Sequence, residues 1–167
     1  MKKVLIGLIT ILIVLGGAGY VKGYVPNTPA YKERIAHEEL MAGLNKLDEM
    51  SEKINGKYVS EYMTRDKAVA MQDEWVKVCL DLKENSSGDE ESKAVDSICS
   101  SLVGNIMTIE SFSSNNGSED IGANQLVVIK EMAKGVDSDA KNFMRVSNDE
   151  DAVKFVEKKF SMYSDRF

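Results

Sequence analysis

An uncharged run near the N-terminus constrains this chain more than any other feature of its sequence. Residues Val4–Val21 form eighteen consecutive positions without a charged side chain, and they directly follow Lys2 and Lys3. A helix of eighteen residues is about 27 Å long, which approaches a bilayer hydrocarbon core of about 30 Å. The run therefore predicts that the chain enters or crosses a membrane.

Residues 1–24 are a retained anchor or a cleaved signal peptide. We expect a retained anchor, because the apolar run continues past its small residues and because Tyr20 and Tyr24 suit the membrane interface. Cleavage is the alternative, since residues 4–15 followed by Gly16-Gly17-Ala18 resemble a signal peptide. In both cases the N-terminal lysines stay in the cytoplasm and the rest of the chain is exported. The basic, short start is typical of bacteria, so we expect a single-pass protein facing the periplasm, or a protein secreted into it.

The remainder is expected to be one all-α domain. Residues 25–30 contain Pro26 and Pro29 and predict a stiff spacer, followed by a domain over 31–167. Proline is absent from the 138 residues after Pro29. Together with periodic apolar residues, this absence favours helices over strands. The sequence predicts an antiparallel bundle of about five helices.

Apolar spacing and capping residues place these helices along the chain. The expected helices are Tyr31–Asn55, one that begins near Thr64 and ends in the polar turn Asn85–Asp89, Glu90–Phe112, one from Ile121 that ends at Gly135, and a last one opened by a capping box over Ser147–Glu150. Residues Tyr58–Met63 are an additional turn or a packed connection, and Ala140–Val146 are a separate short segment. A polar stretch at Ser113–Ser118 predicts a loop.

The same spacing predicts which side chains face the core. We expect Trp75 to be buried, because it shares a helical stripe with Met71, Val78 and Leu82. In the fourth helix the inward residues are expected to be Ile121, Val128, Ile129, Met132 and Val136. Methionine is flexible and fills irregular gaps, so Met50, Met71 and Met132 are interpreted as core residues.

Two cysteines in an exported chain predict one disulfide, between Cys79 and Cys99. Each lies about ten residues, or about 15 Å of helix, from the turn at 87–89, so the two residues face each other if helices two and three form a hairpin. Both also lie on the apolar stripes of their helices. We expect a structural bond, because the spacing is not the Cys-x-x-Cys of redox catalysts.

The exported part is acidic. Without Lys2 and Lys3, 19 Lys and Arg remain against 27 Asp and Glu, which gives a net charge of −8. Such a surface repels phosphate backbones, so nucleic-acid binding is not expected.

No catalytic, cofactor-binding or metal-binding constellation emerges from the sequence, and no motif identifies a family. His37 is the only histidine, so the paired histidines of a zinc-protease helix are missing. Glu33, His37 and Met41 fall on one helix face, but His37 and Met41 supply only two of the ligands that a soft metal such as copper requires. We expect no enzymatic activity, no cofactor and no metal.

Two functions remain open. The first and preferred one is a tethered, non-catalytic interaction module that binds another envelope protein or itself. The second is a periplasmic bundle that binds a small ligand or a metal in its apolar interior. An exposed apolar patch on a closed core favours the first, and a deep pocket near His37 or Trp75 favours the second.

Overall fold

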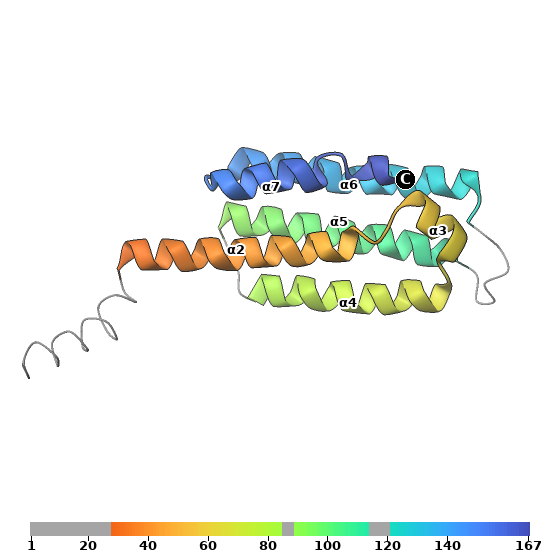
Figure 1. Ribbon diagram of the computed structural model, residues 1–167, viewed down its shortest axis with the longest axis horizontal. Helices are drawn as coiled ribbons and strands as arrows, with labels where there is room; N and C mark the ends of the chain where they lie inside the picture. The colour runs from red at the N-terminus through yellow and green to blue at the C-terminus, as the bar shows by residue number, and fades with distance from the viewer. Residues whose placement is uncertain (1–27, 85–88, 114–120) are drawn as a thin grey trace, which may run out of the picture. The chain divides into compact units, whose positions relative to one another are not determined.

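The structure is a computed structural model that describes residues 28–84, 89–113 and 121–167. Within these residues the chain is all-α, with six antiparallel α-helices, a short 3-10 helix and no strand (Figure 1). The elements are α2 (Pro29–Ser51), α3 (Gly56–Tyr62), α4 (Arg65–Glu84), α5 (Glu90–Phe112), α6 (Ala123–Val146), α7 (Glu150–Phe160) and η3 (Tyr163–Arg166). The predicted antiparallel helical bundle is confirmed, with six helices in the described residues where about five were expected.

The described chain begins close to the predicted spacer. Thr28 precedes α2, and its hydroxyl accepts a hydrogen bond from the backbone N–H of Tyr31 at 3.3 Å. Pro29 is the first helical residue. Its missing N–H costs no hydrogen bond there, because the N–H groups of the first turn have no acceptor within the helix. The predicted anchor over residues 4–21 lies outside the described residues. Among those that are described, no helix combines the length and apolarity needed to span a membrane.

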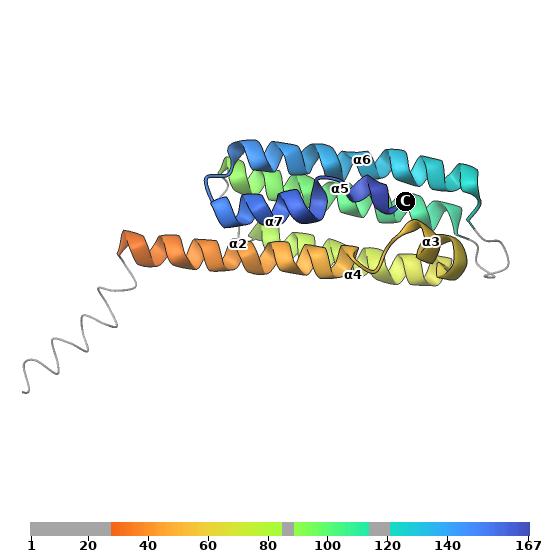
Figure 2. The ribbon, with the colours of Figure 1, turned by 45° about the horizontal axis from the view of Figure 1, so that its top comes forward.

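Contacts divide the chain into two units, Met1–Leu40 and Met41–Phe167, and the second unit holds the bundle discussed below. Its central helix is α5, which packs against α4 on one side and α6 on the other (Figures 1 and 2). The shorter α7 and η3 pack against α6. Six apolar residues that recur at helical spacing along α5 are all buried: Val95, Ile98, Cys99, Leu102, Ile106 and Ile109.

The predicted disulfide is present between α4 and α5. Cys79 and Cys99 are bonded, with their Cα atoms 5.6 Å apart and a separation of 20 positions in the sequence. Trp75 lies one helical turn before Cys79 and is only 2% exposed, so its predicted burial is confirmed as well.

The prediction for the fourth helix was wrong at its end and on one face. Helix α6 continues through Gly135 to Val146, so the predicted separate segment is its last turns. A Cβ atom at Gly135 would lie 3.1 Å from the hydroxyl of Ser101 on α5, which identifies the glycine as a point of close helix contact. The interior glycine costs about 1 kcal/mol of helix stability, and burial of the long α6 outweighs this cost. Val128 and Met132 are exposed, contrary to expectation.

The start of the last helix also differs from the prediction. Asp149, not Ser147, caps α7: its carboxylate accepts hydrogen bonds from the backbone N–H groups of Asp151 and Ala152. The hydroxyl of Ser147 instead donates to the carboxylate of Glu91 on α5. A tertiary contact therefore selects between two residues that are both suited to capping.

Candidate interaction surface

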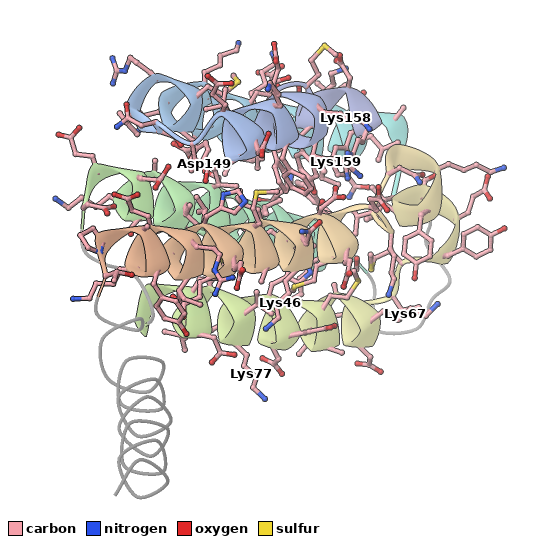
Figure 3. All side chains as sticks on the ribbon, turned by 60° about the vertical axis from the view of Figure 1, so that its left-hand side comes forward. Lys46, Lys67, Lys77, Asp149, Lys158 and Lys159 are labelled. Atoms are coloured by element: carbon pink, nitrogen blue, oxygen red, sulfur yellow. A yellow bond between two sulfur atoms is a disulfide. The ribbon has the colours of Figure 1, made fainter. Side chains whose placement is uncertain are left out.

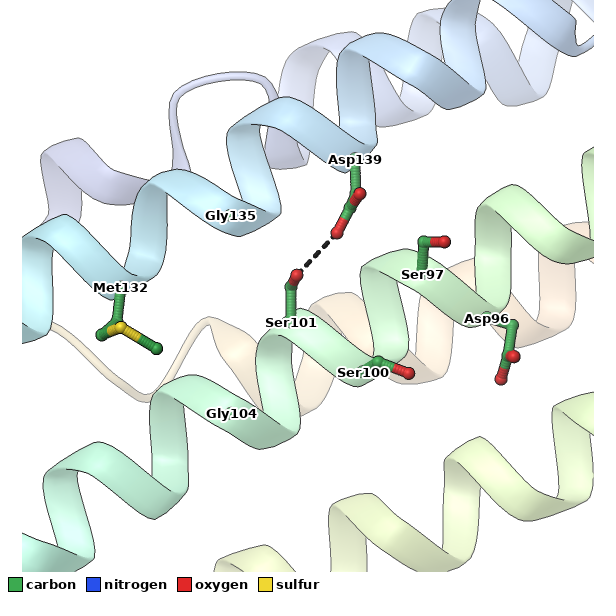
Figure 4. A pocket seen from close by; sticks show the side chains of 8 residues that line it. All are labelled: Asp96, Ser97, Ser100, Ser101, Gly104, Met132, Gly135 and Asp139. Atoms are coloured by element: carbon green, nitrogen blue, oxygen red, sulfur yellow. Dashed lines mark hydrogen bonds between the residues drawn. The ribbon is translucent and has the colours of Figure 1, made fainter.

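An open groove runs between the outer faces of α5 and α6 (Figure 4). Its volume is about 410 Å³, and eight residues line it: Asp96, Ser97, Ser100, Ser101, Gly104, Met132, Gly135 and Asp139. The first five belong to α5 and the last three to α6. The groove lies on the polar side of both helices, opposite the stripes that form the core.

The floor of the groove is low because α5 presents small residues there. Ser97, Ser100 and Gly104 follow each other at steps of three and four, so they share one helix face. A Cβ atom at Gly104 would meet no atom within 4 Å. Unlike Gly135, Gly104 is therefore not required by any contact within the described chain.

One end of the groove is acidic. Asp139 reaches across from α6 and accepts a hydrogen bond of 2.6 Å from the hydroxyl of Ser101, drawn as the dashed line in Figure 4. Asp96 lines the same end from α5. None of the eight lining residues is basic. Of the two carboxylates, Asp139 points toward Ser101, whereas the side chain of Asp96 points away from Asp139 in Figure 4.

The other end is apolar. Met132 lines the groove there and is 49% exposed, while Met107 on α5 and Val128 on α6 are 50% and 44% exposed. Met107 lies one turn beyond Gly104, and Val128 lies one turn before Met132. The side-chain amide of Asn105 donates to the backbone carbonyl of Ile129 at 3.0 Å, which sets Met107 and Val128 at the same level of the antiparallel pair. Of these three apolar residues, only Met132 lines the groove itself.

A second polar cluster ties α7 and η3 to the C-terminal end of α2. The Lys159 ammonium lies 2.5 Å from the buried Asp48 carboxylate and 2.7 Å from that of Glu52. Arg166 donates to Ser51 at 3.2 Å and stacks on the ring of Tyr163, with 4.8 Å between guanidinium carbon and ring centroid. Asp48 Oδ1 is buried without a hydrogen-bond partner among the described residues and lies 3.9 Å from Arg166 Nη2. The remaining contacts make the cluster a structural tie between elements that are distant in the sequence.

The tie makes stability depend on pH. Hydrogen bonding to Lys159, and then its charge, lower the pKa of Glu52 from its ordinary value of 4.5. Hydrogen bonds to Asp48 and Glu52 raise the pKa of Lys159 from its ordinary 10.5. The lowered carboxyl pKa stabilises the fold above 4.5, and this contribution is lost as the pH falls through the folded-state value. The raised ammonium pKa stabilises the fold below 10.5, and this is lost at higher pH.

We predict that Lys159→Met reduces the acid sensitivity of the fold. Without the ammonium, the pKa of Glu52 returns toward its ordinary value, so the native state takes up protons more nearly as the unfolded state does. Urea unfolding at several pH values below 4.5 should show a shallower loss of stability than in the unaltered protein. Lys158→Met is the matched control, because Lys158 is the exposed neighbour on the same helix (Figure 3). Identical acid profiles for the Lys159→Met variant and the unaltered protein would contradict the prediction.

The residues singled out for metal or ligand binding do not assemble into a site. His37 is partly exposed on α2, and no group of three or more His, Cys, Asp or Glu within the described ranges is arranged to hold a metal ion. Trp75 is sealed in the core, and neither residue lines the groove.

Sequence reasoning missed the groove. It assigned Val128 and Met132 to the core and did not single out the small residues of α5. A signal was present, because Ser97, Ser100 and Gly104 lie at helical spacing on the side opposite the apolar stripe. Comparisons of the chain with protein-family models, with curated proteins and with solved structures gave no match.

Proposed function

We propose that this protein is an exported, membrane-tethered and non-catalytic module that binds a helix of another envelope protein in the groove between α5 and α6. Residues 4–21 supply the tether, which confines the module to the membrane surface and raises its effective concentration there. The disulfide between Cys79 and Cys99 suits the oxidising compartment that this topology implies.

Gly104 is the observation that carries the proposal. Glycine in a helix interior is about 1 kcal/mol less favourable than alanine. At Gly104 no neighbouring atom of the described chain would be displaced by a side chain. A glycine at this position is explained by a partner helix that packs closely against the backbone of α5. Small residues allow such close packing between helices.

The flanking apolar side chains support the same use. Met107, Val128 and Met132 are each about half exposed, although the buried core of the unit is closed around Trp75. Exposed apolar groups at one end of a groove are compatible with a protein interaction surface. Methionine in particular adapts its shape to a partner.

Site-specific photo-crosslinking in the native membrane tests the proposal. Benzoylphenylalanine replaces Met132 in the groove in one full-length variant and Met162, which is 70% exposed outside it, in the other. We expect a discrete product with one other protein from position 132 and none from position 162. A product containing two copies of this chain, or equal products from both positions, would overturn the proposal.

Substitutions of Gly104 separate binding from folding. Gly104→Ala should raise the free energy of unfolding by about 0.5–1 kcal/mol, because alanine favours the helix and the space is empty. Gly104→Leu should leave the fold intact, fill the groove and abolish the crosslink from position 132. Gly135→Ala is the control for stability, since crowding against Ser101 opposes its gain in helix propensity. Destabilisation by Gly104→Ala would show that the fold itself requires the glycine. Gly104 would then no longer support a partner-binding groove.

A further inference from the structure

We propose that the C-terminal part of α2, residues 41–51, is a releasable arm. The arm separates from α4 and from the C-terminal strap, which consists of α7 and η3, while α4, α5, α6 and the strap stay folded. This opening does not depend on the groove. Its use rests on the proposed tether: α2 lies between residues 4–21 and the bundle in the chain, so release lengthens the link between the membrane and the groove.

The arm contributes few apolar side chains to the core. Five of its residues are buried, and only Leu44 and Leu47 among them carry large apolar side chains. Gly43 makes a close contact with α4, because a Cβ atom placed on it would overlap Cδ2 of Leu82. A glycine at this point buries no side chain of its own. In α5, by comparison, seven apolar residues are buried. Local opening is favoured in segments that bury few apolar groups.

Asp48 makes the closed position of the arm less favourable. Its side chain is only 9% exposed. One carboxylate oxygen, Oδ2, lies 2.5 Å from the Lys159 ammonium, whereas Oδ1 has no hydrogen-bond partner among the described residues. A buried acceptor of this kind loses its hydration and receives no hydrogen bond in exchange. Release returns the carboxylate to water, and this gain favours the open position.

The strap has its own attachment to α6 and therefore does not leave with the arm. Ser164 donates from its backbone N–H and from its hydroxyl to the Asp137 carboxylate on α6, at 3.0 and 2.5 Å. Phe160 and Tyr163 are fully buried in a strap that packs against α6. The strap reaches the arm through the ion pair of Lys159, and a buried ion pair often stabilises a fold less than apolar side chains of similar volume.

Hydrogen exchange of the full-length chain in lipid nanodiscs, read by mass spectrometry, tests the release. Relative to unstructured peptides, we expect the amides of residues 44–51 to exchange at least about a hundredfold faster than those of residues 98–109 on α5. Amides of residues 154–160 on α7 should be more protected than those of the arm. Equal protection of the arm and α5 would show that the arm opens only with the whole fold. Exchange of α7 at the rate of the arm would show that the strap opens with it. Either result would overturn the proposal.

A double substitution tests the role of the buried charge. Asp48→Leu with Lys159→Met replaces the ion pair by apolar side chains, which should keep the arm closed and slow its exchange by about tenfold. Glu49→Leu with Lys158→Met is the matched control, because it makes the same changes at exposed neighbours on the same two helices and should leave the exchange of the arm unchanged. Unchanged or faster exchange of the arm in the first variant, with α5 still protected, would contradict the proposal.

These measurements are independent of the crosslink in the groove. A fully protected arm would overturn the release and leave the proposed function standing. A missing crosslink from position 132 would contradict the proposed function and leave the release of the arm standing.

Discussion

Trp75→Ala should lower the free energy of unfolding by about 3–5 kcal/mol, the largest effect expected from any single substitution discussed above. The indole is 2% exposed, so its removal loses the burial of a large apolar surface and leaves a cavity among fixed neighbours. A domain of this size is stable by about 5–15 kcal/mol in total, so the variant approaches the limit of folding. Far-UV circular dichroism in urea measures the change, because the variant lacks the chain's only tryptophan.

Leu80→Ala is the matched control for Trp75→Ala. Leu80 lies on the same helix and is 55% exposed, so its removal should change stability by less than about 0.5 kcal/mol. Comparable losses in the two variants would contradict the placement of Trp75 in the core and Leu80 on the surface.

Removal of the disulfide should cost about 3 kcal/mol. In the unfolded chain the bond closes a loop between residues 20 apart, and loss of this restraint increases the entropy of the unfolded state. The double variant Cys79→Ala/Cys99→Ala should therefore remain helical and unfold at lower urea concentration. Cys99 is fully buried, so loss of its sulfur adds a smaller cavity term in the same direction.

Reduction of the unaltered protein provides the control for the disulfide. With dithiothreitol present, its unfolding midpoint should move most of the way to that of the double variant, while the double variant itself should not respond. A reduced protein as stable as the oxidised one would show that the crosslink contributes nothing to stability.

The local signals in the sequence were sufficient where a helix is determined by its own residues. Helix α5 begins and ends at Glu90 and Phe112, as predicted. Asp89 caps it by accepting from the N–H of Ser92 at 2.8 Å, and an unbroken apolar stripe runs along it. The disulfide followed from the same helix positions together with the export signal. The helix depends on residues a few positions apart, and the disulfide on two cysteines 20 positions apart across a single turn.

The sequence failed where a distant segment changes the balance between local preferences. Gly135 looked like a helix end, and Ser147 looked like a cap. The packing of α6 against α5 keeps Gly135 within a helix. The side chain of Ser147 donates a hydrogen bond to Glu91 and does not cap the last helix. Local preferences of about 1 kcal/mol are easily reversed by such contacts.

By itself, the sequence determined the helical class, the inward stripe of α5 and the pairing of Cys79 with Cys99, because helical period and cysteine count depend on nothing outside the chain's own order. Only the tertiary structure decided which polar faces lie side by side. The groove joins Gly104 of α5 to Met132 of α6, residues whose neighbourhood depends on how two helices pack. A glycine needed for packing, such as Gly135, and one that leaves space open, such as Gly104, are indistinguishable until the atoms facing them are in place.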